Sequence, residues 1–148
     1  MSRIDDLLKE NNLIFLDTAV FIYHFEANPH YLPTTKTIFK NIEAGKIQGL
    51  TTTITLAEIV TKPLENGQIE AVEDYKYLLN NFPNLTIADI NQKIAIIGAG
   101  LRAKYKFKLP DALQLAGGIA HKAALFITND KRIQKVKEIK VVTLDELL

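Results

Sequence analysis

The chain has 148 residues, of which 47% are hydrophobic and 24% charged, and its formal net charge is +1. This length is typical of one globular domain, and so apolar and weakly charged a composition excludes an intrinsically disordered chain. The sequence contains no cysteine and a single serine, Ser2. Serine and cysteine hydrolases, disulfide-rich folds and cysteine-based zinc sites are therefore not expected.

No apolar run reaches the roughly 18 residues of a membrane span, and the opening MSRIDDLLKENN is acidic where a signal peptide is basic. We therefore expect a soluble, cytoplasmic protein. Charge is distributed unevenly, since residues 1–101 contain eight Lys and Arg against twelve Asp and Glu, whereas residues 102–148 contain ten against five. The basic C-terminal third is a candidate surface for a polyanion.

Short β-type runs alternate with longer stretches of helical periodicity, which is the pattern of a parallel sheet covered by helices on both faces. We predict an α/β fold with a central parallel sheet of four to five strands, in a single domain over residues 1–148. The first expected elements are a packing helix within 1–12, a strand at 13–16, a short helix through 22–25, a helix ending near 45, a strand at 48–52, and helices at 55–62 and 69–80. They are followed by a strand at 85–88, helices at 90–106 and from 110 onward, strands at 125–128 and 140–143, and a short helical tail.

Prolines set two of these helix boundaries. The helix beginning at Thr55 is expected to end at Lys62, because the residue before Pro63 is disfavoured in the α region. Pro110 is expected at the first position of its helix, where a missing N–H is no loss. The paired glycines within the last two long helical stretches lack the strand-turn-helix context of a dinucleotide loop, so they predict close helix packing instead.

Acidic residues are predicted at the carboxyl ends of the strands. Asp17 directly follows the first strand, and Asp130 follows the fourth. Glu58 lies one turn into the helix after the second strand, and Asp111 lies at the start of the helix that contains Pro110. Because the carboxyl ends of parallel strands meet at one edge of the sheet, where ligands bind, the four side chains are expected to converge.

Each acid also has a purely structural explanation. Asp17 and Asp130 are suitable capping residues, and Thr55-x-x-Glu58 matches a capping box. Asp111 suits the positive end of a helix dipole. Four such caps gathered at one edge would nevertheless repel each other unless a cation lay among them.

A divalent cation resolves this repulsion. A ligand set made only of carboxylate oxygens favours Mg²⁺ or Mn²⁺ over zinc. One or two such ions are the usual device for hydrolysing a phosphodiester bond with water. This chemistry needs no nucleophilic side chain, in agreement with the composition.

Four segments carry these acids in a specific order. They are LDTAVFIYHF, TTTITLAEIVTKP, KLPDALQLAGGIA and FITNDKRI. In order and spacing they resemble the PIN-domain family, and more narrowly the VapC-type ribonuclease toxins of bacterial toxin–antitoxin pairs, from Leu13 to Leu147. The resemblance implies a metal-binding, catalytic set of Asp17, Glu58, Asp111 and Asp130, with the Thr128 hydroxyl orienting a carboxylate or water. It also implies an endoribonuclease dependent on one or two Mg²⁺ or Mn²⁺ ions, a cognate antitoxin as partner, and a homodimer.

Ala19 departs from the family pattern, which often has a small polar residue there, so a hydrogen bond in the site is either missing or supplied by Thr18. This departure keeps open a non-catalytic PIN-like module that binds RNA or a protein. A phospho-accepting domain with Asp17 as the nucleophile is the third interpretation. It fits poorly, because the dehalogenase pattern requires a second aspartate where Ala19 stands.

Basic residues near the acids are candidate RNA contacts. Lys104 and Lys106 alternate with Tyr105 and Phe107, and Lys131 and Arg132 directly follow Asp130. Tyr105 is a candidate for stacking on an unpaired base, whereas Phe107 is expected in the core. The alternative for Lys104 and Lys106 is that they complement the negative C-terminal end of the long helix before Pro110. The three histidines show no metal-ligand spacing and are expected to be structural or exposed.

Overall fold

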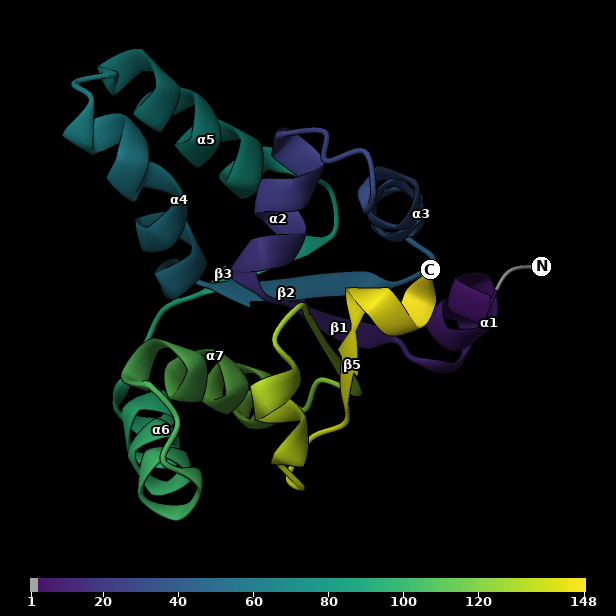
Figure 1. Cartoon of the computed structure of the whole chain (residues 1–148), viewed down its shortest axis with the longest axis vertical. Helices are drawn as coiled ribbons and strands as arrows, with labels where there is room; N and C mark the ends of the chain where they lie inside the picture. Colours follow the sequence, from purple (N-terminus) through teal and green to yellow (C-terminus); the bar gives the residue numbers. More distant parts are fainter. Residues whose placement is uncertain (1–2) are drawn as a thin grey trace.

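A five-stranded parallel sheet runs through the centre of the molecule (Figure 1). The computed structural model describes residues 3–148. Its strands are β1 (Leu13–Leu16), β2 (Gln48–Thr52), β3 (Leu85–Ala88), β4 (Leu125–Thr128) and β5 (Val141–Thr143). They are ordered β3-β2-β1-β4-β5, and every neighbouring pair is parallel. The predicted α/β fold is confirmed, and only β5 begins one residue later than expected.

Helices connect the strands. Within residues 3–148 they are α1 (Arg3–Glu10), α2 (Thr18–Phe25), α3 (Leu32–Glu43), α4 (Thr53–Glu65), α5 (Ile69–Asn81), α6 (Gln92–Tyr105) and α7 (Leu109–Ala120), with the 3-10 helices η1 (Lys131–Lys135) and η2 (Leu144–Leu147). None of the helices in this described range has the length and apolar character needed to cross a bilayer.

Helices cover both faces of the sheet. α2 to α5 lie on one face and α6 and α7 on the other (Figure 1). Alternation along β1 divides the core accordingly, since Ile14 and Leu16 pack with the first helix layer and Phe15 packs with the second. Phe15 stacks on Phe126 of β4 with ring centroids 4.7 Å apart. Such strands, buried on both faces, explain why the sequence shows short continuous apolar runs.

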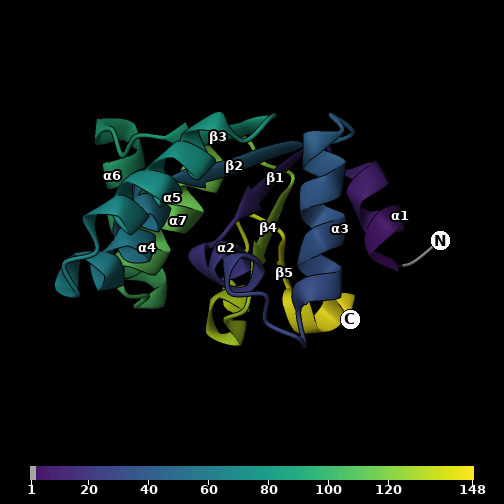
Figure 2. The same ribbon diagram turned by 90° about the horizontal axis from the view of Figure 1, so that it is seen from above.

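The N-terminal helix contributes to packing, as predicted. Ile4 and Leu8 of α1 are buried in the core cluster on the α2–α5 side of the sheet. Figure 2 shows α1 alongside α3, at the opposite end of the molecule from α4. Residues Met1 and Ser2, which belong to the predicted N-terminal extension, lie outside the described residues.

The predicted end of the fourth helix is wrong. α4 runs from Thr53 to Glu65 and contains Pro63. The proline lies in the last turn, where it removes only one intrahelical donor, and its ring is buried. The carbonyl groups of Lys62 and Pro63 accept hydrogen bonds from the backbone N–H groups of Asn66 and Gln68, so the turn around the proline remains closed. Pro110 is likewise the second residue of α7 rather than the first.

Close helix packing explains three of the glycines. A Cβ atom at Gly117 of α7 would lie 2.6 Å from Cγ2 of Thr52, and one at Gly98 of α6 would lie 2.9 Å from a methyl group of Leu113. A Cβ atom at Gly118 would be similarly close to Ile139, at 3.0 Å. A Cβ atom at Gly100 would meet no neighbouring side chain within 4 Å, so packing does not explain this glycine.

Gly117→Ala should destabilise the protein by about 1–3 kcal/mol, because the added methyl group overlaps a buried, β-branched side chain. Gly100→Ala is the matched control in a neighbouring helix. It should leave stability unchanged or raise it by up to about 1 kcal/mol through helix propensity. Urea unfolding of both variants measures the difference, and equal stability of the two would show that α7 has room to move away from the sheet.

Candidate active site

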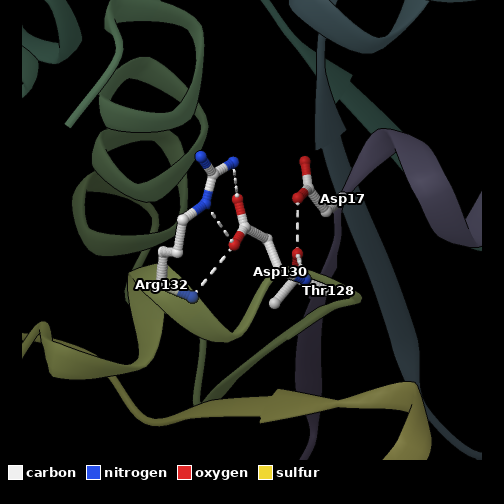
Figure 3. Close-up of polar contacts among 4 residues, drawn as sticks. All are labelled: Asp17, Thr128, Asp130 and Arg132. Carbon is white, nitrogen blue, oxygen red and sulfur yellow. Dashed lines mark hydrogen bonds and ion pairs between the residues drawn. The ribbon is translucent and has the colours of Figure 1, made fainter.

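Asp17 is the most central of the predicted acids. It directly follows β1, and the parallel register that pairs Leu16 with Ile127 places it beside Thr128, the last residue of β4. The Thr128 hydroxyl donates a hydrogen bond of 2.7 Å to Oδ2 of Asp17 (Figure 3). Oδ1 accepts hydrogen bonds from the Thr18 backbone N–H at 3.0 Å and from the Gln114 amide at 3.3 Å. Asp17 is therefore both the cap of α2 and a fully oriented carboxylate.

Burial raises the pKa of Asp17 from 3.8 to about 6. Desolvation is the largest cause, because it disfavours the charged form. The hydrogen bonds from Thr128 and Thr18 favour the charged form and oppose this shift, whereas the negative charges of Asp111 and Glu58 add to it. Three of the four predicted carboxyl groups thus interact electrostatically at this edge of the sheet.

Glu58 is oriented by a threonine hydroxyl rather than by a capping box. α4 begins at Thr53 and its cap is Thr52, whose hydroxyl accepts from the Ile54 N–H at 3.1 Å, so the predicted box from Thr55 to Glu58 is wrong. Oε1 of Glu58 instead accepts a hydrogen bond of 2.7 Å from the Thr18 hydroxyl. Thr18, the neighbour of Ala19, thus provides a side-chain hydrogen bond within the candidate site.

Asp111 lies in the first turn of α7 and is partly buried. Its pKa is raised, first by desolvation and then by the negative charges of Asp130 and Glu58. Arg132 and Lys108 oppose this shift with their positive charges. Asp111 is thereby linked electrostatically to acids from two other segments of the chain.

Asp130 differs from the other acids because a cation already neutralises it. Its Oδ1 accepts from Nε of Arg132 at 3.0 Å and its Oδ2 accepts from Nη2 at 2.8 Å, which makes a two-pronged ion pair (Figure 3). Oδ1 also caps η1 through the Arg132 backbone N–H at 2.9 Å. The pKa of Asp130 is lowered, chiefly by the Arg132 hydrogen bond. The capping role considered from the sequence is thus present, together with a side-chain pair that the sequence did not reveal.

Gln114 is a site residue that sequence reasoning missed. It is buried, and its amide nitrogen donates to the hydroxyl oxygens of Thr55 at 2.7 Å and Thr18 at 3.3 Å, as well as to Asp17. Its amide oxygen accepts from the Thr52 hydroxyl at 2.5 Å. The available signal was a glutamine three residues after Asp111, on an otherwise apolar helix face. Gln114 of α7 thereby joins the start of α2, the end of β2 and α4 at the carboxylate that lies deepest in the site.

The donor chemistry of this edge fits a hard divalent cation, although the side chains are not gathered around a single point. Among the described residues, no group of three or more His, Asp or Glu side chains is close enough to hold a metal ion. In the same part of the chain, no Lys or Arg forms an ion pair with Asp17, Glu58 or Asp111. These three carboxyl groups repel each other and form no ion pair with a basic side chain, and carboxylate oxygens are the ligands that Mg²⁺ and Mn²⁺ prefer.

The candidate RNA contacts occupy different environments. Lys104 forms an ion pair with Glu138 at 3.4 Å, and the Tyr105 hydroxyl donates to the same carboxylate. The Tyr105 ring stacks on Phe107, which is buried as predicted. Lys106 and Arg132 line a cavity next to Asp111 and Asp130, and Lys131 is exposed beside them. Tyr105 is therefore engaged with its own chain in this structure.

Asp17 should make the metal-free protein less stable as pH rises from about 4 to about 6. The unfolded carboxyl loses its proton near pH 3.8, whereas the folded one keeps it to about pH 6, so the difference reaches at most about 3 kcal/mol at neutral pH. Asp17→Asn should remove this pH dependence and be more stable than the parent at pH 7. Urea unfolding in EDTA at several pH values measures it, with Asp74→Asn on exposed α5 as the control.

The comparison between variants also removes the effect of other titrating groups. The pKa of His24 is lowered, chiefly by desolvation. Near neutral pH this group therefore makes the folded protein more stable as pH rises, which is opposite to the effect of Asp17. A parallel pH dependence in the parent and in Asp17→Asn would contradict the buried, high-pKa state of Asp17.

Comparison with known proteins supports one family. The sequence matches the PIN domain over residues 14–139. The chain is similar to a solved toxin–antitoxin complex from Klebsiella pneumoniae, with 27% identity and a TM-score of 0.67 over 88% of this chain and 97% of that chain. No curated protein sequence matches significantly.

Two more distant structures show the same fold. One is VapBC2 from Rickettsia felis bound to a promoter DNA fragment, with 19% identity and a TM-score of 0.66 over 88% of this chain and 98% of that chain. The other is FitAcB from Neisseria gonorrhoeae, with 17% identity and a TM-score of 0.67 over 90% of this chain and 99% of that chain. PIN domains are typically nucleases and generally bind divalent metal ions. Because the sequence match spans most of the chain and the fold agrees with it, this chain belongs to the PIN domain family.

Proposed function

We propose that the chain is a metal-dependent endoribonuclease that hydrolyses phosphodiester bonds in RNA. The observation that carries this proposal is the buried Asp17 carboxyl, oriented by three hydrogen bonds and repelled by Asp111 and Glu58. A purely structural cap does not need two further acids beside it, because they raise the free energy of its charged form. Membership of the PIN family supports the same interpretation.

In this proposal Asp17, Glu58, Asp111 and Asp130 hold one or two Mg²⁺ or Mn²⁺ ions. Held by these carboxylates, such a cation would offset their repulsion and would supply Lewis-acid chemistry for the attack of water and for the leaving oxygen. Asp17 must be ionised to bind a cation, so the affinity for Mg²⁺ or Mn²⁺ should increase with pH up to about 6, where the metal-free carboxyl loses its proton. Thr128 and Gln114 keep its two oxygens in fixed directions.

Glu58 and Asp130 are positioned by different means. Thr18 holds one oxygen of Glu58, which leaves the other oxygen available. Arg132 holds both oxygens of Asp130, with one hydrogen bond to Oδ2. Because a carboxylate oxygen can accept two interactions, Asp130 can bind a metal ion through Oδ2 and keep its contact with Arg132. The phosphodiester bond breaks by attack of water, so no covalent intermediate forms on the chain.

Cleavage of RNA should require the metal and Asp17. Purified protein incubated with a pool of structured and unstructured RNAs should cut it with Mg²⁺ or Mn²⁺ and not with EDTA, and Asp17→Asn should be inactive. Thr128→Val should reduce metal affinity or rate by roughly 10- to 100-fold, because it removes a hydrogen bond that orients the ligand. Asp74→Asn should retain full activity.

Equal inactivity of the parent and Asp17→Asn at high enzyme concentration, together with no Mn²⁺ binding by calorimetry, would favour the non-catalytic PIN-like module. Gel electrophoresis of end-labelled RNA gives the readout and maps the cut positions. Asp17→Asn also tests against a contaminating nuclease, since a contaminant would cut equally in both preparations.

We also propose that the chain is the toxin of a toxin–antitoxin pair, with an antitoxin protein as its partner and a homodimer as its working form. The similarity to a toxin–antitoxin complex at 27% identity supports the partner. The proposed location in the cell is the cytoplasm, where both RNA and the antitoxin would be present.

Induced expression of the parent chain in a bacterial host should arrest growth, because cleavage of cellular RNA stops protein synthesis. Expression of Asp17→Asn at the same protein level should not. Growth curves with immunoblotting measure both quantities, and arrest by the variant would mean that toxicity does not depend on the carboxylate site.

A further inference from the structure

A cavity of about 200 Å³ lies directly beside the acidic site. Asp111 and Asp130 form one side of it. The connection between α6 and α7 and the 3-10 helix η1 form the rest, through Lys106, Phe107, Lys108, Arg132, Ile133 and Lys135. Segments from two separate parts of the chain thus enclose a space that opens onto two of the proposed metal ligands.

Four of these lining residues are cations, and only one of them has a carboxylate partner in the cavity. Arg132 pairs with Asp130 through Nε and Nη2, so its second terminal nitrogen takes no part in that pair. Lys135 lies over the Phe107 ring, with Nζ 5.3 Å from the ring centre, which holds its aliphatic stem against the cavity wall. The cavity therefore carries more positive than negative charge.

Lys106 occupies a backbone conformation that normally selects glycine. It is the C-cap of α6, with φ of +65°, in the left-handed region. A side chain here carries a conformational penalty that glycine avoids, so the lysine is unfavourable for the fold alone. Strained residues of this kind gather at functional sites, and here the strain places a cation at the cavity.

The opposite side of the site has a different character. A second cavity, of about 420 Å³, is lined by Glu58 together with apolar and polar side chains, and it contains two carboxylates, Glu26 and Glu58, against a single cation, Lys62. Of these two cavities, the one beside Asp111 and Asp130 therefore has an excess of positive charge, and the one beside Glu58 does not. A polyanion that crosses the carboxylates is attracted more strongly to the side of Asp111 and Asp130.

We propose that the cavity lined by Lys106, Lys108, Arg132 and Lys135 binds a backbone phosphate of single-stranded RNA, next to the phosphodiester group that is cleaved at the carboxylates. This inference rests on the proposed function for the identity of the strand, but binding to the cavity needs neither metal nor cleavage. The cavity fixes which part of the strand lies over Asp111, and so sets the cutting position relative to the bound phosphate.

The test is RNA binding in EDTA, measured by fluorescence anisotropy with a labelled single-stranded oligoribonucleotide between about 50 and 200 mM KCl. Each lost phosphate contact should reduce the slope of log Kd against log salt concentration by about 0.7. Lys106→Gly and Lys135→Gln should each weaken binding and reduce the slope by up to this amount, because both cations contact the same phosphate. Lys106→Gly should also keep or raise the Tm, because glycine relieves the left-handed backbone, so weaker binding would not come from unfolding.

Lys122→Gly is the matched control. Lys122 also has a positive φ, +58°, and lies beyond the far end of α7, a 12-residue helix about 18 Å long. The Lys122→Gly substitution removes the same charge and the same backbone penalty as Lys106→Gly, and it should leave the slope of log Kd against log salt concentration unchanged.

Two results would overturn the inference. One is an unchanged slope of log Kd against log salt concentration in both cavity variants. It would mean that the cavity does not contact RNA, and it would favour an acidic protein segment as the ligand. The other is no measurable binding by the parent chain at low salt. Either result can occur in a protein that cleaves RNA. Conversely, RNA binding that depends on the cavity lysines can occur in a protein that does not cleave RNA. The binding test and the cleavage test therefore fail independently.

Discussion

The site depends on keeping one carboxylate in a place where its charge is unfavourable. Asp17 comes directly after the central strand of the sheet, and desolvation raises its pKa to about 6. The hydroxyl of Thr128, the N–H of Thr18 and the amide of Gln114 reach it from β4, α2 and α7. Strand order, the start of α2 and the position of α7 all have to be correct for these donors to meet, so the fold and the site are specified by the same contacts.

Threonine hydroxyls extend this arrangement away from Asp17. Thr51 donates to the Leu16 carbonyl at 2.9 Å and lies 2.7 Å from the hydroxyl of Thr55, which in turn is 3.2 Å from that of Thr18. These side chains are buried, so each hydroxyl must find a partner within the protein. The short, β-branched threonine side chains thereby connect the orientation of Glu58 to the carboxyl end of β2.

Local patterns were sufficient to predict the strands and most of the helices, and to expect four acids near one edge of the sheet. Strands buried on both faces are short apolar runs, and acids that follow strands in a parallel sheet share one edge, so neither inference needs tertiary detail. Gln114 and the pairing of Arg132 with Asp130 could not be predicted in this way. Gln114 acquires its role only because α7 packs across β2 and β1. Arg132, two residues after Asp130, could adopt many side-chain conformations that do not pair with it. The C-terminal end of α4 was missed because burial of Pro63 outweighs a local preference.

The close approach of α7 to the sheet limits how this site can vary. Thr52 of β2 lies against Gly117. Asp111 and Gln114 belong to the same helix and interact with the other acids of the candidate site. A larger side chain at position 117 could be accommodated only if α7 moved away from Thr52, and Asp111 and Gln114 would then move with the helix. Changes at a position without any polar side chain can therefore alter the geometry of the carboxylates. The small residues on the inner side of α7 thus determine how closely this helix approaches the sheet, and with it the placement of the polar side chains in the candidate site.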